Sequence, residues 1–462
     1  MTMVERLARF AARASYDMLS ADAAAQLKVR VLDSLACALG ARDAGPVRRV
    51  REHVRALDKG GPCSLIGGGT AAPHHAALHN GVLVRYLDYN DSYLAPGETC
   101  HPSDNLAPVL AACEAAEARG DRFLTALAVA YQVQCRLSDE APVRARGFDH
   151  TTQLACSAAA GAAKGLGLDE ERTAHAVAIA TTALAALRVT RTGALSQWKG
   201  LAAPHAGFGA LHAALLAARG ITGPREVFEG NKGFMESLSG RFRLDWDNED
   251  LERVRRTVVK KHNAEVHSQT AIEAALDLKR EHALEGRDIA RVEVATFDVA
   301  HAIIGGGEEG DKTRVRTKEE ADHSLPYMVA AALLDGGLGP AQYEEARILS
   351  DDVQELLSKV VVRPLEEYSR RFPREMPSRV IVRLRDGRAV SKERVDYEGF
   401  TSRPMPWEGA VGKLRRLAPA DSPVLDELVE TVASLEARPV TGLCRLLSPR
   451  PSAASARAEA RP

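Results

Sequence analysis

The chain has 462 residues, more than one hydrophobic core usually holds, so two to three domains are expected. Its 45% hydrophobic and 27% charged residues are typical of a soluble globular protein. The formal net charge of -1 indicates neither the basic surface of a nucleic-acid-binding protein nor an acidic solvating tail. We therefore expect no nucleic-acid partner.

The seven cysteines are scattered and form no Cys-x-x-Cys pair. This argues against a zinc ribbon, a disulfide framework or a compact iron–sulfur ligand set. The N-terminus has no basic segment followed by an uninterrupted apolar core, and no apolar run is expected to reach the length of a membrane span. These features predict a cytoplasmic protein with reduced thiols and no membrane partner.

Residues 1–265 show apolar side chains at helical spacing in one run after another. The predicted helices cover residues 3–12, 23–41, 106–117, 123–137, 153–166, 170–187 and 202–218. Gly161 and Gly167 are expected at helix ends or at close helix contacts. The glycine-rich loop 66–69 lacks the Gly-Lys-Ser/Thr ending of a phosphate-binding loop, which disfavours a nucleotide-dependent reaction.

The pattern changes after about residue 285. Residues 290–304 and 360–364 alternate like strands, and the Asp386-Gly387 pair inside 379–390 predicts a hairpin. Helices are expected at 327–334 and 352–359, and helical periodicity returns over 407–439. We predict a mainly α fold with an inserted α+β domain. The all-helical domain takes residues 1–268 and 398–447, the α+β domain takes 269–397, and the tail 448–462 is expected to be disordered.

The most polar stretch of the chain lies between two helical runs, at residues 86–105. It brings Asp88, Asp91 and His101 close together in sequence. Carboxylates beside an imidazole are what proton transfer requires, and polar loops between helices are typical binding regions. A simpler interpretation also stays open, in which Ser103 or Asp104 only caps the helix that follows.

A cationic segment follows at residues 188–200, with Arg191 and Lys199 beside Ser196 and small residues that allow close backbone approach. An arginine fork and a compact ammonium both suit the carboxylates of a polyanionic substrate. The plainer alternative is a solvated connection with surface cations, and composition alone favours it.

Three more candidates lie near predicted helix starts. His267 follows Lys260 and Lys261, whose charges would lower its proton affinity and suit a neutral base, although such a histidine is more often structural. Tyr327 is a proton donor, a carboxylate ligand or a core residue with its hydroxyl at the rim, and His150 is a further candidate. His75 and His79 have a spacing that can bind metal, but no carboxylate partner lies nearby in sequence, so no metal site and no cofactor are expected.

Four motifs, taken together, resemble one family. HPSDN at 101–105, RTGALSQWKG at 191–200, NAEVHSQTAIEAAL at 263–276 and ADHSLPYMVA at 321–330 occur in the order and at the spacing of the MmgE/PrpD family. That family includes 2-methylcitrate dehydratase and the related cis-aconitate decarboxylase. The resemblance covers residues 5–440.

The resemblance implies a large helical domain built from both chain ends with a smaller α+β lid, usually as a homodimer, and activity without a metal or iron–sulfur cluster. It places the active site between the helical domain and the lid. The implied site residues are Asp91, His101, His150, Lys199, Lys261, His267 and Tyr327, with Lys260 as the alternative to Lys261.

The resulting prediction is a cofactor-independent hydro-lyase that converts 2-methylcitrate or citrate to a cis-aconitate-type alkene. Lys199, Lys261 and Arg191 are expected to bind carboxylates, with Ser196 and Asp88 in the same binding set. His101, oriented by Asp91, is one half of the acid–base pair, and Tyr327, His150 or His267 is the other.

Two alternatives remain at this stage. One is decarboxylation or epimerisation of a small polycarboxylate on the same scaffold. Decarboxylation is less favoured because Ala95 stands where the resembling decarboxylases have threonine, and the unusual segment 92–100 leaves the substrate open. The other is a non-catalytic protein that binds a polycarboxylate.

Overall fold

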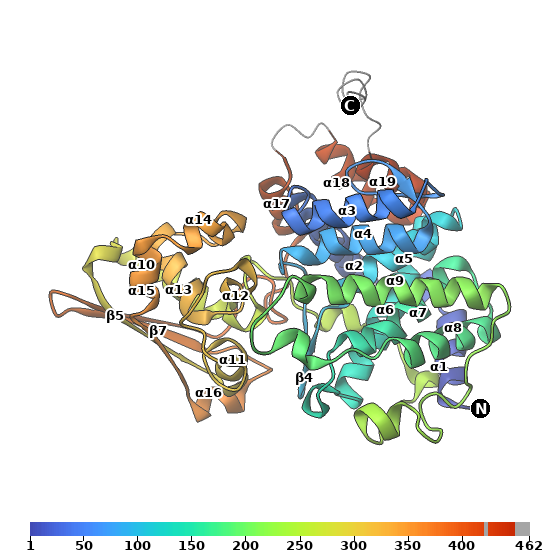
Figure 1. Cartoon of the computed structure of the whole chain (residues 1–462), viewed down its shortest axis with the longest axis horizontal. Helices are drawn as coiled ribbons and strands as arrows, with labels where there is room; N and C mark the ends of the chain where they lie inside the picture. The colour runs from blue at the N-terminus through green and yellow to red at the C-terminus, as the bar shows by residue number, and fades with distance from the viewer. Residues whose placement is uncertain (420–423, 449–462) are drawn as a thin grey trace.

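The computed structural model describes residues 1–419 and 424–448. Apart from Ser448, the predicted tail lies outside the described residues. The protein is mostly helical with one small mixed sheet, which confirms the mainly α prediction. Figure 1 shows a large helical body beside a smaller lobe that contains the sheet.

The helical body contains twelve α-helices among the described residues. They are α1 (Met3–Arg13), α2 (Ala21–Gly40), α3 (Gly45–Leu57), α4 (Pro73–Tyr86), α5 (Leu106–Ala115), α6 (Gly120–Glu140), α7 (Thr151–Leu166), α8 (Glu170–Ala183), α9 (Trp198–Ala218), α17 (Trp407–Leu417), α18 (Leu425–Ala433) and α19 (Val440–Leu447). One apolar core runs from Met3 in α1 to Leu447 in α19, and α17 and α18 pack against α2 (Figure 1). Both ends of the chain therefore build this core.

Small residues let these helices approach closely. A Cβ added to Gly161 of α7 would lie 2.8 Å from the Cβ of Ala130 and 3.0 Å from the carbonyl oxygen of Ala126, both in α6. The predicted close helix contact at Gly161 is therefore confirmed. This tight packing holds α6 and α7 as a rigid wall behind the site.

Two features of the body differ from the sequence predictions. Instead of helices up to residue 265, the segment between α9 and α10 (Gln269–His282) holds only short turns: η5 (Met235–Ser239), η6 (Trp246–Asn248), η7 (Arg253–Arg256) and η8 (Val266–Ser268). Glycines at 220, 223, 230, 233 and 240 explain this, because glycine disfavours helix interiors. α9 is also long and apolar enough to cross a membrane by length and composition, contrary to expectation. It packs against α4, α7 and α8, as a core helix does.

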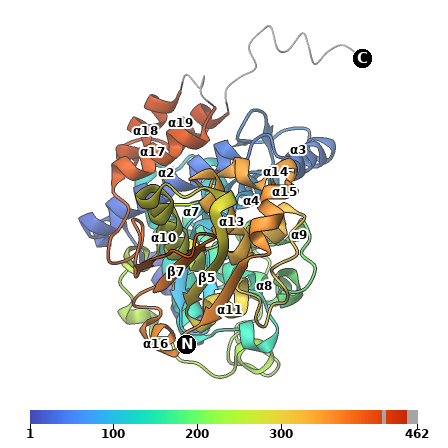
Figure 2. The ribbon, with the colours of Figure 1, turned by 90° about the vertical axis from the view of Figure 1, so that its left-hand side faces the viewer.

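The lobe has its own apolar core, from Ala264 to Leu384, and faces the viewer in Figure 2. Its helices are α10, α11 (Asp298–Ile304), α12 (Lys318–Ala321), α13 (Leu325–Asp335), α14 (Glu345–Ile348), α15 (Asp351–Leu357) and α16 (Glu366–Arg371). Its strands are β5 (Ile289–Thr296), β6 (Val360–Pro364), β7 (Ser378–Leu384) and β8 (Ala389–Arg394).

The sheet has the order β6-β5-β7-β8, with β5 parallel to β6 and the other pairs antiparallel. The predicted hairpin is confirmed: β7 and β8 pair through Val382 and Val390, and Gly387 has a φ of 90° in the turn. The strand predicted over 290–304 is confirmed for its first half and wrong for its second half. β5 ends at Thr296, and α11 follows because Ala300, Ile303 and Ile304 bury one helical face.

Two short hairpins lie in the body: β1 (Cys63–Ser64) with β2 (Thr70–Ala71), and β3 (Tyr93–Ala95) with β4 (Glu98–Cys100). The second of these positions the site. It follows α4 directly and returns the chain to η2 (Pro102–Asn105) before α5 begins.

Candidate active site

A pocket lies where the helical body meets the lobe. The body contributes Arg85, Glu98, Thr99, His101, Arg144, His150, Arg188 and Arg191, and the rest of the lining is Glu265, His267, Ile303, Glu309 and His323. Four guanidinium groups and four imidazoles therefore converge on one small space. Such a set suits an anionic substrate and proton transfer.

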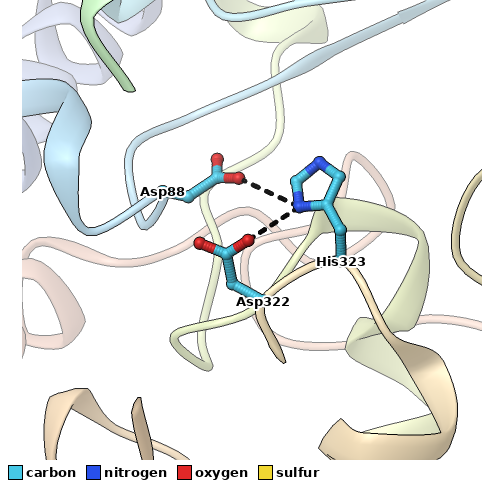
Figure 3. Close-up of side chains that lie close together, drawn as sticks. All are labelled: Asp88, Asp322 and His323. Atoms are coloured by element: carbon cyan, nitrogen blue, oxygen red, sulfur yellow. Dashed lines mark hydrogen bonds and ion pairs between the residues drawn. The ribbon is translucent and has the colours of Figure 1, made fainter. Parts of the chain in front are cut away.

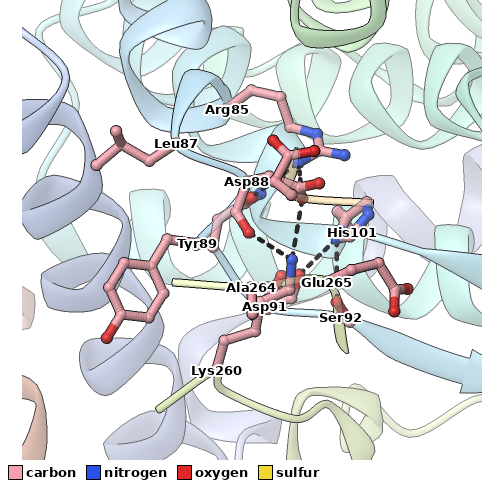
Figure 4. A network of polar contacts seen from close by, with 12 residues as sticks. Arg85, Leu87, Asp88, Tyr89, Asp91, Ser92, His101, Lys260, Ala264 and Glu265 are labelled. Carbon is pink, nitrogen blue, oxygen red and sulfur yellow. Dashed lines mark hydrogen bonds and ion pairs between the residues drawn. The ribbon is translucent and has the colours of Figure 1, made fainter. Parts of the chain in front are cut away.

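His101 is held by the β3–β4 hairpin. Because the hairpin pairs Tyr93 with Cys100, the next opposite positions are Ser92 and His101. The His101 Nδ1 atom lies 2.8 Å from the main-chain carbonyl oxygen of Asp91 and 3.1 Å from Ser92 Oγ (Figure 4). A carbonyl only accepts hydrogen bonds, so Nδ1 carries the proton and Nε2 keeps its lone pair.

The surroundings keep this imidazole neutral. Burial lowers the pKa of His101 well below its usual value, and the nearby charges of Arg85 and Lys260 lower it further. A neutral ring with a free Nε2 lone pair, lining a pocket with four arginines, has the properties of a general base.

Asp91 acts on His101 through its backbone, which corrects the expected carboxylate–imidazole contact. The Asp91 carboxylate is fully buried and accepts hydrogen bonds from the Ser103 amide at 2.9 Å and the Tyr131 hydroxyl at 2.8 Å. Burial raises its pKa above the usual value, although these hydrogen bonds and Arg30 work in the opposite direction. Asp91 therefore fixes the loop that positions His101, and its side chain does not line the pocket.

Two further predicted histidines line the same pocket. His267 Nδ1 lies 2.7 Å from Glu265 Oε1, and His267 Nε2 is buried without a hydrogen-bond partner. His150 is the N-cap residue of α7, with Nδ1 3.5 Å from Asp149 Oδ1 and Nε2 also buried without a partner. Burial lowers the pKa of His150 to about 3, so it is neutral. The His101 and His150 rings lie edge to face, with centroids 5.4 Å apart.

The arginines of the pocket are held by buried carboxylates. Arg191, a predicted ligand of the substrate, donates to Asp149 at 2.9 Å through Nε and to the Lys199 carbonyl at 2.8 Å. Arg85 pairs with Asp88 and lies 3.7 Å from Asp104. Burial raises the pKa of Asp104 to about 7, although Arg85 counteracts this. These carboxylates fix the guanidinium groups at the pocket wall.

Asp88 is the centre of a buried ion-pair cluster rather than a ligand at the pocket surface. It contacts Arg85 and lies 2.9 Å from Lys260 Nζ (Figure 4). Lys199 Nζ lies 3.5 Å from it. Burial alone would raise its pKa, but these three cations outweigh burial and hold the pKa well below its usual range. A fixed anion here positions the cations and would repel a substrate carboxylate, which corrects the expected binding role.

Asp88, Asp322 and His323 lie close enough together to share one metal ion (Figure 3). The Lys199 ammonium occupies this cluster, because it contacts Asp322 Oδ1 and lies 2.8 Å from His323 Nδ1. Lys318 also binds Asp322, at 2.6 Å. The donor set is thus satisfied by protein cations, and a divalent ion would have to displace Lys199.

Three more predicted residues lie away from the pocket. Tyr327 lies in the first turn of α13 with its ring in the lobe core, and its hydroxyl donates to the Gln342 carbonyl. Ser196 is exposed on the loop before α9. Lys261 turns outward to Glu273 at 2.8 Å, whereas Lys260 is fully buried beside Asp88. Of the two adjacent lysines, only Lys260 joins the buried cluster beside the pocket.

Comparison with known proteins identifies the family of this chain. Residues 5–247 match the MmgE/PrpD N-terminal domain and residues 262–435 match the MmgE/PrpD C-terminal domain. The chain belongs to the MmgE/PrpD family.

Several curated proteins are similar to this family member. It is 33% identical to 2-methylcitrate dehydratase of Escherichia coli (strain K12) over 292 residues, 59% of each chain. It is 30% identical to 2-methylcitrate dehydratase of Cupriavidus necator over 352 residues, 70% of each chain. A fungal alkylcitrate dehydratase, phiI, is 27% identical over 84% of this chain and 82% of its own length. The match to the Escherichia coli protein thus spans less than two thirds of that protein.

Sequence reasoning missed several residues of this MmgE/PrpD pocket. Arg85 stands in an apolar helix, and Glu98, Arg144, Glu265 and Glu309 stand in segments that resemble ordinary polar loops. A charged residue inside an apolar helical run was the one available signal, because arginine is rarely buried unless it is paired. The others carried no signal, because only the fold brings their segments together.

Proposed function

We propose that this protein is a hydro-lyase of a citrate-type tricarboxylic acid, with 2-methylcitrate or citrate as substrate and a cis-aconitate-type alkene as product. The names of its relatives support the reaction class. The observation that carries the proposal is the neutral His101 imidazole, whose free Nε2 lies among four arginines.

The arginines and the imidazole answer the two demands of the first step. The proton next to a carboxylate is weakly acidic, so charge that develops on that carboxylate must be stabilised as the proton leaves. Arg85 and Arg191 are fixed in place by buried carboxylates and need no reorganisation to do this. His101 Nε2 takes the proton, since its ring stays neutral to well below neutral pH.

The hydroxyl group must leave with a proton, and we assign this donor to His267. Glu265 Oε1 accepts the hydrogen bond from His267 Nδ1 at 2.7 Å and orients the ring, and Nε2, which has no hydrogen-bond partner, is the atom that we assign to the leaving hydroxyl group. Burial would raise the pKa of Glu265, but His267, His323 and Lys260 outweigh it, so Glu265 stays ionised. His101 lies near Arg85 and Lys260, whereas His267 contacts Glu265. We therefore assign the base to His101 and the acid to His267.

We propose that residues 269–397 form a lid over a helical domain made of 1–268 and 398–447. The separate apolar cores and a pocket lined from both sides support this division. We also propose that catalysis needs no metal or other cofactor. The Lys199 ammonium in the Asp88–Asp322–His323 cluster supports this, and no cysteine is found among the lining residues in the described part of the chain.

The proposed enzyme is a cytoplasmic homodimer. Free, buried cysteines fit a reducing compartment. Leu187, Val189 and Trp198 are 61%, 70% and 47% exposed around an apolar groove beside α9, and exposed apolar groups of this size suit a subunit contact. Sedimentation of the wild type and of Val189→Glu tests whether this groove is the dimer contact. A wild-type dimer that dissociates in the variant supports the contact, and the same mass for both proteins contradicts it.

The test of the reaction is an assay in the presence of a chelator with 2-methylcitrate, citrate and cis-aconitate, each alone. Alkene absorbance and mass spectrometry of the products separate water loss from CO2 release. His101→Gln should reduce turnover strongly, while His282→Gln, at an exposed histidine, should not change it. Release of CO2 from cis-aconitate, without water loss from either citrate, would contradict the proposal.

A further inference from the structure

Glu309 reaches from the lobe across the pocket to the helical body. It follows α11, and its Oε1 atom accepts hydrogen bonds from Arg144 Nη2 at 2.9 Å and from Arg188 Nη2. The side chain is buried, and Oε2 has no hydrogen-bond partner. A carboxylate from the protein thus sits between two guanidinium groups that line a pocket for carboxylates.

This arginine pair differs from the other two arginines of the pocket. Arg85 and Arg191 are held by buried carboxylates of the body itself. Within residues 1–419 and 424–448, the Arg144 guanidinium has Glu309 as its one ion-pair partner. Arg188 also approaches Asp149, but at 3.7 Å. Arg144 and Arg188 are therefore the guanidinium groups that removal of Glu309 would free.

The segment that carries Glu309 is rich in glycine and joins the body through few contacts. Gly305, Gly306, Gly307 and Gly310 surround it, and Gly306 and Gly310 have φ values of 97° and 98°. Its main-chain hydrogen bonds stay inside the lobe, as from the Glu309 amide to the Ala302 carbonyl at 3.0 Å. In the described part of the chain, Glu309 makes the only hydrogen bonds and ion pairs from 305–317 to the body.

We propose that Arg144 and Arg188 form a carboxylate subsite, which Glu309 fills until a carboxylate of the substrate displaces it. The identity of the ligand as a polycarboxylate rests on the proposed function. The subsite itself rests on the contacts of Glu309. Because Glu309 competes for the pair, the apparent affinity for an anion is reduced by the fraction of molecules in which Glu309 is seated.

The test measures binding of succinate and of citrate by calorimetry. Glu309→Gln keeps the shape of the side chain but removes its charge, so it should bind succinate about tenfold more tightly than the wild type. Glu309→Asp, which is one methylene shorter, should shift affinity in the same direction. Glu308→Gln is the matched control, because Glu308 is the exposed neighbour and should not change binding.

A third variant shows where the gain arises. Adding Arg144→Gln to Glu309→Gln should erase the tighter binding. The inference is overturned if Glu309→Gln, compared with Glu308→Gln in folded protein, binds neither anion more tightly, or if the gain survives the loss of Arg144. If Glu309→Gln binds succinate more tightly but the protein turns over neither citrate, the proposed reaction is wrong and the subsite is supported. If the protein turns over citrate but Glu309→Gln binds no anion more tightly, the subsite is wrong and the proposed reaction is supported.

Discussion

Asp88→Asn isolates one charge at the centre of the site. Asp88 has a φ of 53°, in the left-handed region, where asparagine is as well tolerated as aspartate. The substitution therefore removes the charge with little backbone strain. It leaves Arg85 close to Asp104 and leaves Lys199 paired with Asp322.

Lys260 is the cation that loses most. It is fully buried, and among the described residues Asp88 is the only carboxylate within ion-pair distance of its ammonium. The Asp88 carbonyl, at 2.6 Å, would remain as an acceptor. Breaking a buried ion pair from one side costs about 3–5 kcal/mol, because the other charge stays buried without compensation. We expect Asp88→Asn to lower the free energy of unfolding by this amount.

The measurement is a double-mutant cycle by urea unfolding. Lys260→Met alone should also destabilise, because it leaves Asp88 with fewer cations. In Asp88→Asn/Lys260→Met both charges are gone, so the loss should be smaller than the sum of the single losses by about 2 kcal/mol. Lys261→Met is the control, since Lys261 is 35% exposed at its side chain and exposed pairs contribute about 0–1 kcal/mol.

Two results would refute this reasoning. Additive losses in the cycle would show that Asp88 and Lys260 do not depend on each other. A larger loss for Lys261→Met than for Lys260→Met would show that the other lysine faces the site.

Three further predictions follow from the same geometry. His101→Gln should reduce kcat about 10²–10⁴-fold, which is the usual contribution of a positioned base, and should change the melting temperature little. An unchanged kcat would show that His101 is not the base. Tyr327→Phe should keep kcat and lose only the hydrogen bond to Gln342, about 1 kcal/mol of stability, whereas a large fall in kcat would return Tyr327 to the chemistry. The pKa values of His101, His150 and His323 are lowered in the folded protein, so the unfolded chain binds protons first as the pH falls. Each of these histidines should therefore lower stability below about pH 6.5, by up to about 1.4 kcal/mol per pH unit. Asp104, whose pKa burial raises to about 7, acts in the opposite direction over the same range, so urea unfolding between pH 7 and 5 measures the histidine losses minus the Asp104 gain.

The sequence predicted what depends on local pattern. Most helices of the body, the strand 360–364 and the Asp386-Gly387 hairpin follow from periodicity and turn chemistry. His101, His150, Arg191 and His267 were found because they stand at polar breaks between apolar runs, and all four line the pocket. Lys199 was found in the same way and lies directly behind it.

What the sequence did not predict depends on long-range pairing. Nothing local distinguishes Glu309 from the exposed Glu308, because the partners of Glu309 lie on the other side of the pocket. Tyr327 had the right chemistry, but the Ser324 cap sets the helical phase of α13 and turns the ring into the lobe core. Lys260 and Lys261 are adjacent and chemically identical, so the sequence could not show that Lys260 is buried beside Asp88 and Lys261 points outward to Glu273.

Two carboxylates of the lobe, Asp322 and Glu309, bind cations of the body near the pocket, and they are held differently. Asp322 is fully buried between Lys199 and Lys318 and caps the C-terminal end of α12. Glu309 stands on a glycine-rich segment, and the free Oε2 atom leaves its carboxylate only half satisfied. An incoming anion gains little by displacing Asp322, because two lysines and the helix hold it. It gains two arginines by displacing Glu309, and only one loop has to move. Ligand entry should therefore release the Glu309 side of the interface first, while the Asp322 side keeps the lobe attached to the body.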